Sequence, residues 1–89
     1  MYYVYILQCI DGSFYTGSTN DVEKRLEAHF AGKGAKYTKS HKPEKVIYSE
    51  VYLTKKEALQ REWQIKKWSR KKKEYLIQGT MVPSVVEGL

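Results

Sequence analysis

The sequence predicts a single small α+β domain whose elements follow the order β-β-α-β-α-α. Two runs rich in aromatic and β-branched residues flank a turn dipeptide at residues 11–12, a pattern typical of a β-hairpin. A helical pattern with capping signals follows at residues 21–29, and residues 46–53 alternate as a strand before further helical patterns. With 89 residues, the chain is large enough for one modest hydrophobic core.

The length of the hairpin loop decides which strand residues share a face, because side chains alternate with period two. A two-residue loop at Asp11-Gly12 would put Tyr5 and Tyr15 on opposite faces. A three-residue loop, with Gly12 in a left-handed conformation, pairs Tyr5 with Gly17 and gathers both tyrosines on one face. We favour the three-residue loop, and we expect open space at Gly17 through which a substrate could approach.

The first helix is expected to begin after Asn20, a good N-cap, with Glu23 completing a box-like arrangement. Arg25 and His29 lie four residues apart, so they point the same way from successive turns. Gly32 is expected to end the helix. The row that should face the core repeats every four residues and consists of Val22, Leu26 and Phe30.

The stretch Gly32–Thr38 superficially resembles a phosphate-binding loop. It lacks the Gly-Lys-Ser/Thr ending, follows a helix and precedes no helical pattern, which argues against a nucleotide-binding P-loop. We expect a flexible basic loop that continues through residues 39–45, where Pro43 interrupts regular structure.

Residues 46–53 alternate well enough to predict a third strand. One side of this strand should carry Tyr48, Glu50 and Tyr52. The other side should carry Ile47, Val51 and Leu53.

Thr54 and Glu57 form a second capping box, which predicts a helix running to about Trp68. Glu62 falls in the middle of the apolar arc of this helix, which consists of Ala58, Leu59 and Ile65. A carboxylate that faces the interior needs a partner or a metal ion, because burying it alone costs several kcal/mol.

A basic run follows, and a break near Ser69 is expected to lead into a last helix that ends at Gly79. The aromatic residues Trp63, Trp68 and Tyr75 are interleaved with this run, where they either stack on nucleobases or pack a small core. Residues 80–89 show no usable pattern, so we expect a domain over residues 1–79 and a loose tail.

The net charge of +6 is unevenly distributed along the chain. Residues 33–73 contain fourteen Lys or Arg against four Glu, whereas residues 1–32 are slightly acidic. This asymmetry suggests a polyanionic partner such as nucleic acid, and the alternative is a solvated surface that aids solubility. The basic residues expected to bind nucleic acid are Lys36, Lys66, Lys67, Arg70, Lys71, Lys72 and Lys73.

Several classes of protein are excluded by composition. The lone Cys9 cannot form an internal disulfide, and one Cys with two His makes a zinc site implausible. No apolar run is long enough for a membrane span, and the N-terminus lacks the basic flank of a signal peptide. We therefore expect a cytoplasmic protein with no membrane partner.

Five segments, in this order and at these spacings, resemble the motifs of the GIY-YIG nuclease superfamily. Tyr3-Val4-Tyr5 precedes Tyr15-Thr16-Gly17, with ten residues from Tyr5 to Tyr15. The later segments are Arg25-Leu26-Glu27-Ala28-His29, Gly32-Lys33-Gly34-Ala35-Lys36-Tyr37-Thr38 and Ala58-Leu59-Gln60-Arg61-Glu62. The resemblance covers about residues 2–78 and is closest to the small stand-alone single-domain members.

The resemblance implies a three-stranded antiparallel sheet flanked by helices. It also implies a nuclease that hydrolyses phosphodiester bonds with one divalent ion, Mg²⁺ or Mn²⁺. By the same resemblance, Glu62 binds the metal, and the catalytic residues are Tyr5, Tyr15, Arg25, His29 and Glu62.

These residue types suit phosphodiester hydrolysis. A tyrosine with the ordinary pKa near 10 is only about 0.1% ionised at pH 7, so a nearby cation has to assist Tyr5 before it can accept a proton from water. His29 is an alternative base or proton relay, and Tyr15 could orient water or phosphate. Arg25 would hold the scissile phosphate through its planar fork, and Glu62 would carry the metal.

The chain departs from the family pattern at two positions. Tyr3 stands at the first glycine of the name motif, which matters little for a strand residue. Ser18 stands where many repair members carry a lysine, so a positive charge has to come from elsewhere, with Lys24 and Lys36 among the candidates.

These observations and the resemblance together predict a metal-dependent nuclease that acts on DNA. Its expected substrates are branched, damaged or single-stranded DNA, and its expected process is DNA repair. The alternative is a catalytically weak or inactive nucleic-acid-binding module of the same fold, and a third candidate is a small basic RNA-associated protein. The domain carries no added specificity module, so a protein partner would have to supply sequence recognition.

Overall fold

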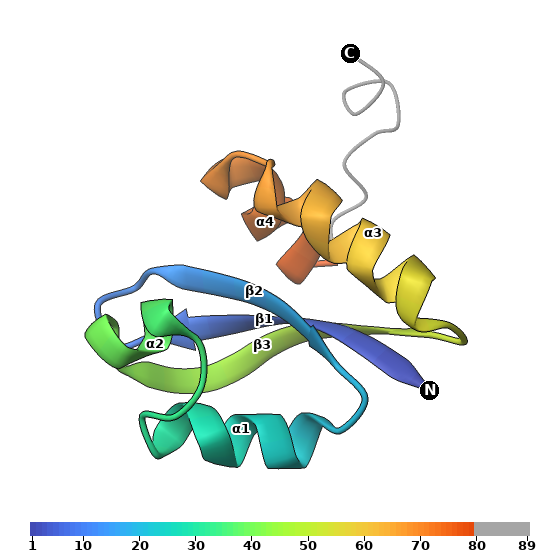
Figure 1. Ribbon diagram of the computed structural model, residues 1–89. Coiled ribbons are helices and arrows are strands. Elements are labelled where there is room, and N and C mark those ends of the chain that lie inside the picture. The colour runs from blue at the N-terminus through green and yellow to red at the C-terminus, as the bar shows by residue number, and fades with distance from the viewer. Residues whose placement is uncertain (80–89) are drawn as a thin grey trace.

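The computed structural model describes residues 1–79, and the loose tail predicted for residues 80–89 lies outside the described residues. The described residues form three strands and four helices (Figure 1). The strands are β1 (Tyr2–Cys9), β2 (Phe14–Thr19) and β3 (Pro43–Tyr52). The helices are α1 (Val22–Phe30), α2 (Lys36–Ser40), α3 (Lys55–Lys66) and α4 (Arg70–Ile77).

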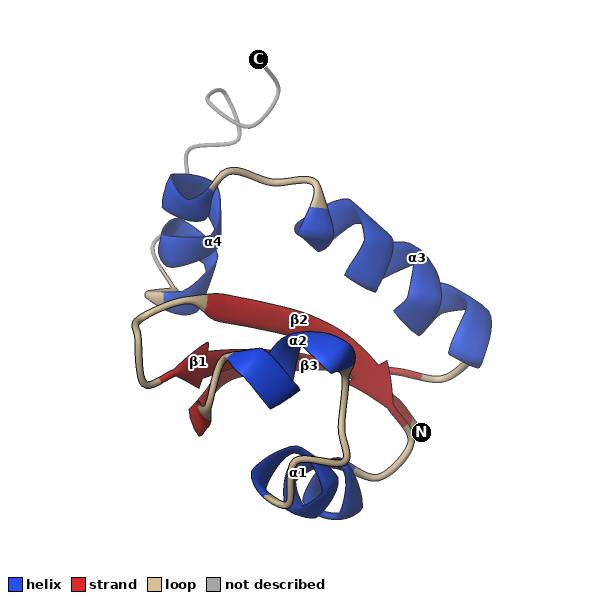
Figure 2. Ribbon diagram, turned by 60° about the vertical axis from the view of Figure 1, so that its left-hand side comes forward, coloured by secondary structure: helices blue, strands red, loops and turns tan. Residues whose placement is uncertain are grey.

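The strands form one antiparallel sheet, as predicted, and their order in it is β2-β1-β3. Helices α3 and α4 lie over one face of this sheet, and α1 lies against the other (Figures 1 and 2). β1 is therefore central, and β2 is an edge strand whose outer side is free of strand partners within the described residues.

The hairpin has the three-residue loop. Tyr5 pairs with Gly17, Leu7 pairs with Tyr15, and the Cys9 amide donates to the carbonyl of Ser13 (2.8 Å). Gly12 closes the loop with a φ of +86°, the left-handed conformation that favours glycine. The predicted register is thus confirmed.

The central strand is buried on both faces. Val4 and Ile6 pack with Ala58 and Ile65 of α3, and none of the four is more than 1% exposed. Tyr5 lies on the opposite face and is also buried. Burial on both sides explains why this strand is apolar without the alternation typical of a half-exposed strand.

Helix α1 begins one residue later than predicted and is rotated relative to the expected face. Asp21 rather than Asn20 is the N-cap, and its carboxylate accepts from the Lys24 amide (3.1 Å). Phe30, expected in the core, is 55% exposed, whereas His29 is fully buried. The rotation follows from the hydrogen-bonding partners that the imidazole finds inside, which make its burial favourable.

The segment expected as loop contains a short helix and the start of a strand. Helix α2 has no side-chain cap and only five residues, too few for a periodic pattern to show in the sequence. Strand β3 begins at Pro43, three residues before the predicted start, and pairs there with Cys9. Proline is tolerated as the first residue of an edge strand.

The C-terminal helices largely follow prediction. The Thr54 hydroxyl accepts from the Glu57 amide, and Ser69 caps α4 by accepting from the Lys72 amide (3.2 Å). α3 ends at Lys66 rather than Trp68. Leu59 is 46% exposed, contrary to expectation, because α3 faces the sheet along the row of residues 58, 62 and 65. No helix within residues 1–79 combines the length and apolar character required to cross a membrane.

Candidate active site

The centre of the candidate site is the hydroxyl of Tyr5, on the face of the sheet covered by α1. Arg25 donates to this oxygen from Nε at 3.4 Å, and Nε2 of His29 lies 2.8 Å from it. Both partners come from successive turns of α1, as their spacing predicted. Tyr5 is 1% exposed and His29 is 0% exposed, so both rings are buried.

The direction of each hydrogen bond follows from Thr38, which lies in the segment predicted as a loop. The Thr38 hydroxyl donates to the Ala35 carbonyl (2.9 Å), so its oxygen is left to accept from Nδ1–H of His29 (2.8 Å). Nε2 of His29 then carries the lone pair and accepts the Tyr5 proton. Thr38, on α2, thereby sets the imidazole tautomer.

Burial controls the protonation of both groups. It lowers the pKa of His29 below its ordinary value, with a smaller contribution from the charge of Arg25, so the imidazole is neutral at pH 7. Burial also raises the pKa of Tyr5 to about 12, against the opposing hydrogen bond from Arg25. The free protein therefore holds a neutral phenol that donates to a neutral imidazole.

Two glycines let the rings come together. A Cβ on Gly17 would lie 2.5 Å from the Tyr5 hydroxyl oxygen, and a Cβ on Gly34 would collide with Nδ1 of His29. The expectation of open space at Gly17 was wrong, because the Tyr5 hydroxyl itself occupies it. The role of Gly34 was missed, since it becomes visible only when the loop after α1 folds back over the imidazole.

Tyr15 joins this cluster from β2. Its ring lies 6.3 Å from that of Tyr5 and 5.3 Å from that of His29, centroid to centroid. On its far side, Tyr37 of α2 stacks at 6.0 Å, and the Lys66 ammonium lies 5.7 Å from the Tyr15 ring centroid. Four of the five predicted catalytic residues are thus in mutual contact.

Glu62, the fifth, comes from α3 on the other face of the sheet. It accepts from the Ser18 hydroxyl at Oε1 (2.5 Å) and pairs with Lys66 at Oε2 (2.7 Å). Ser18 pairs with Val4 across the strands, so it belongs to the α3 face, whereas neighbouring Gly17 covers Tyr5. The two halves of the candidate site therefore meet around the free edge of β2 rather than within one pocket.

Hollows follow that edge. One of 220 Å³ includes Arg25 in its lining, and one of 260 Å³ includes Ser18; both also include Thr19 and Asn20. The Ser18 hydroxyl then connects to Glu62, which lines a third hollow of 490 Å³ on α3. The hollows at Arg25 and Ser18 thus share lining residues at the end of β2, and the hydrogen bond from Ser18 links them to Glu62.

The residues at Glu62 suit a divalent ion held mainly by water. Residues 1–79 contain no group of three or more His, Cys, Asp or Glu that could hold a metal. Mg²⁺ is often held by one or two carboxylates together with waters and substrate phosphate, so a single carboxylate is compatible with it. The Lys66 ammonium pairs with Oε2 of Glu62, so the space beside this oxygen accommodates a cation.

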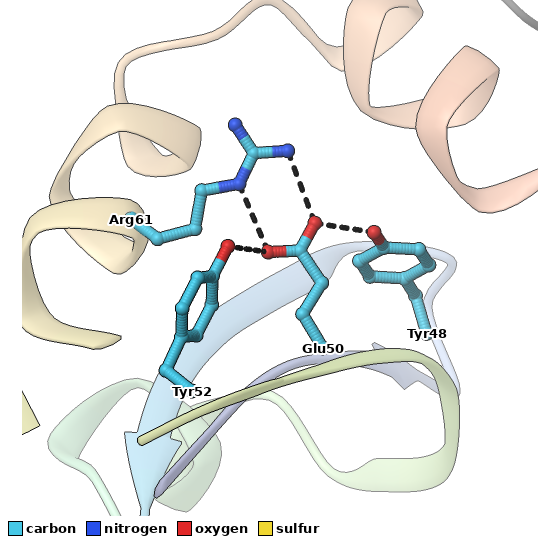
Figure 3. Close-up of polar contacts among 4 residues, drawn as sticks. All are labelled: Tyr48, Glu50, Tyr52 and Arg61. Atoms are coloured by element: carbon cyan, nitrogen blue, oxygen red, sulfur yellow. Dashed lines mark hydrogen bonds and ion pairs between the residues drawn. The ribbon is translucent and has the colours of Figure 1, made fainter. Parts of the chain in front are cut away.

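A second polar cluster, absent from the predicted site, ties β3 to α3 (Figure 3). Arg61 binds Glu50 with two parallel hydrogen bonds of 2.9 and 3.0 Å, and the hydroxyls of Tyr48 and Tyr52 also donate to this carboxylate. Burial alone would raise the pKa of Glu50, but these donors offset it and leave the pKa below its usual value. Every carboxylate oxygen is occupied, so the cluster is structural.

The predicted basic residues do not form a uniform patch. Four of them fold back onto the protein: Lys66 onto Glu62, Lys67 over the ring of Trp63, Arg70 over Phe14 and Lys72 over Trp68. Lys36 and Lys71 are exposed, and the pKa of Lys73 is lowered by burial and by nearby Lys66 and Arg70. Trp68 packs against the core, whereas Trp63 is 63% exposed, so the interleaved aromatics serve different purposes.

Comparison with known proteins agrees with this architecture. The family model for the GIY-YIG catalytic domain matches residues 1–75. The chain therefore belongs to the GIY-YIG family, a nuclease family whose members generally depend on a divalent metal, and the domain suggests a nucleic-acid substrate.

Within that family, the chain is similar to small UPF0213 proteins. It is 51% identical over 77 residues to one from Bacillus pumilus, covering 86% of this chain and 79% of the relative. It is 53% identical over 76 residues to one from Staphylococcus saprophyticus, covering 85% and 93%. The solution NMR structure of a UPF0213 protein from Bacillus halodurans matches with a TM-score of 0.58 and 45% identity, covering 94% of this chain and 90% of that one.

Proposed function

We propose that this protein is a metal-dependent endonuclease that hydrolyses DNA phosphodiester bonds, with DNA repair in the cytoplasm as its setting. The observation that carries the proposal is the Tyr5 hydroxyl held between Arg25 Nε and a neutral His29. The candidate catalytic residues remain Tyr5, Tyr15, Arg25, His29 and Glu62, within a domain spanning residues 1–79.

The Tyr5–His29 pair supplies the base. As the oxygen of the attacking water bonds to phosphorus, its proton passes to the Tyr5 oxygen while the Tyr5 proton passes to Nε2 of His29. The phosphorus–oxygen bond to the leaving group breaks, and the leaving oxygen takes a proton from solvent. This relay avoids a free phenolate, which the pKa of about 12 makes unfavourable.

Arg25 supplies the phosphate contact. It uses Nε on Tyr5, and within residues 1–79 no carboxylate forms an ion pair with it. Its uncompensated charge is therefore available to stabilise negative charge on the phosphate oxygens.

Glu62 would hold the divalent ion, Mg²⁺ or Mn²⁺, with Ser18 orienting its carboxylate. When bound, such an ion neutralises charge on the phosphate and the leaving oxygen. Lys66 would have to release the Glu62 carboxylate for an ion to bind there. Its ammonium lies 5.7 Å from the Tyr15 ring centroid and would supply the positive charge that many repair members carry as a lysine at the position of Ser18.

The test is cleavage of plasmid and single-stranded DNA with Mg²⁺ or Mn²⁺, followed by addition of EDTA. Glu62→Gln should abolish metal-dependent cutting, and EDTA should stop the wild type. Glu44→Gln is the matched control, because Glu44 is exposed on β3 and should leave the rate unchanged. Cutting should also rise with pH through a pKa below 6.5, the ordinary histidine value, and then level off.

Equal cutting by Glu62→Gln and wild type would contradict the proposal, because a contaminating nuclease would then explain the activity. DNA binding without cutting would instead favour the binding module of the same fold. Preference for RNA over DNA would reassign the substrate.

A further inference from the structure

Helix α3 carries a groove whose apolar side chains have no role in the proposed chemistry. Leu59 and Trp63 lie one turn apart and are 46% and 63% exposed. They line the hollow of 490 Å³ together with Gln60, Glu62 and Lys66. A large exposed indole in a helix that already has a packed face indicates a contact surface rather than core.

A cation covers one face of the indole. The Lys67 ammonium lies over the Trp63 ring, 3.3 Å from its centroid, so a base would stack on the opposite face of this exposed side chain. Lys66 also lines the groove and pairs with Glu62. A nucleobase combines a flat π-face with a phosphate on either side, and an aromatic platform beside ammonium groups matches both parts.

We propose that this groove, the Leu59–Trp63 groove, binds one unpaired nucleobase by stacking on Trp63, with the adjoining phosphate at Lys66 and Lys67. The inference rests on the proposed function and deepens it, because Glu62 lines the same groove. A base seated there brings a neighbouring phosphate to that carboxylate. The substrate class is therefore a nucleic acid with an unpaired base next to the cut, since bases inside a duplex have both faces covered.

A protein partner fits this groove less well. Stable protein interfaces bury about 800 Å² on each side, whereas the groove offers two apolar side chains. The one carboxylate that lines the groove is paired with Lys66, and the Lys67 ammonium over Trp63 has no carboxylate partner within residues 1–79. Charge complementarity therefore favours a polyanion.

The test is equilibrium binding of a short oligothymidylate to the full chain in EDTA, where cutting cannot interfere. Trp63→Ala should weaken this binding by about fivefold or more, the lower end for losing one stacked base. Trp63→Phe should retain most of the affinity, and binding of a duplex of equal length should change by less than about twofold. Leu53→Ala is the matched control, because Leu53 is 77% exposed and does not line the groove.

Tryptophan fluorescence gives an independent readout. Oligothymidylate should quench the emission of the wild type and of Leu53→Ala, and the quenching should be largely lost in Trp63→Phe. An abasic oligonucleotide of the same length should quench little. Thermal melts of all variants should match, since Trp63 is exposed.

Equal affinity of Trp63→Ala and wild type for oligothymidylate would overturn the inference, as would equal binding of the abasic oligonucleotide. Self-association that depends on Trp63 without any effect on oligonucleotide binding would assign the groove to protein contact and would also overturn it. These outcomes are distinct from failure of the proposed function. DNA cleavage together with oligothymidylate binding that does not depend on Trp63 would contradict only the role of the groove. Trp63-dependent binding without cleavage would contradict only the nuclease activity.

Discussion

Two clusters in this small domain each join tyrosine and arginine side chains, and they differ in the group that accepts the tyrosine hydrogen bond. In the cluster of Tyr48, Glu50, Tyr52 and Arg61, a carboxylate cancels the guanidinium and accepts from both phenols. In the cluster of Tyr5, Arg25 and His29, a neutral imidazole takes the place of that carboxylate.

The difference decides what each arginine can do. Arg61 has its charge matched and its fork occupied, and it also stacks 4.9 Å from the ring centroid of Trp68. Arg25 keeps an unmatched charge at the rim of a hollow. A closed cluster, in which a carboxylate matches the charge of the arginine, stabilises a fold. An open cluster, in which the arginine keeps an unmatched charge, can receive a phosphate. The predictions below separate these two roles.

The largest effect is expected at the open cluster. Arg25→Ala should reduce the cleavage rate by roughly 10³-fold, in line with the loss of one strong electrostatic contact to the transition state. Its free energy of unfolding should change by less than about 1 kcal/mol, because no carboxylate within residues 1–79 is left unpaired. Cleavage kinetics measure the first quantity and urea unfolding measures the second. A large loss of folding stability with little change in the cleavage rate would contradict the role of Arg25 in binding the phosphate.

The closed cluster should show the opposite pattern. Arg61→Ala leaves the carboxylate of Glu50, 15% exposed, with its charge unmatched, and should lower the free energy of unfolding by about 3 kcal/mol. The double variant Glu50→Gln with Arg61→Met should lose less, because no charge is left uncompensated. Urea unfolding tests both, and a larger loss in the double variant would show that packing on Trp68 dominates.

A smaller effect is expected at the residue that sets the tautomer. Thr38→Val keeps the shape of the side chain but removes the acceptor for Nδ1–H of His29, and cleavage should fall by roughly 10-fold or more. Thr38→Ser should restore the rate. Nitrogen chemical shifts of His29 should show Nε2 unprotonated in the wild type and a mixed tautomer in Thr38→Val; unchanged shifts would exclude the positioning role.

The smallest effect is the pH dependence of stability. Above pH 6.5, His29 is neutral in both the folded and the unfolded chain. As the pH falls below 6.5, the unfolded chain binds a proton that the folded chain resists, so the free energy of unfolding decreases, by at most about 1.4 kcal/mol per pH unit. His29→Gln should lose this part of the pH dependence, and identical slopes in the two proteins would show that burial does not hold the imidazole neutral.

Local patterns predicted much of this architecture. The favoured hairpin register relied on Gly12 and the alternation around it, and the cap at Thr54 and the break near Ser69 were readable because each signal lies within a few residues. Predictions that needed the rotation of a helix were less successful. Phe30 was expected inside but is exposed, since apolar periodicity alone did not reveal that His29 would take the inward position. Leu59 was also expected inside but is 46% exposed, although Glu62 of the same predicted arc does face the sheet and accepts from Ser18.

The sequence alone indicated the order of every described element except α2, favoured the register that puts Tyr5 and Tyr15 on one face, and determined the common direction of Arg25 and His29, because each depends on local patterns. Only the tertiary structure decided that Thr38 and Gly34 enclose the imidazole, that Glu50 closes a second cluster, and that Glu62 reaches the free edge of β2 through Ser18. These contacts join segments distant in the chain, and their energies depend on burial and on the orientation of whole helices, which no local pattern encodes.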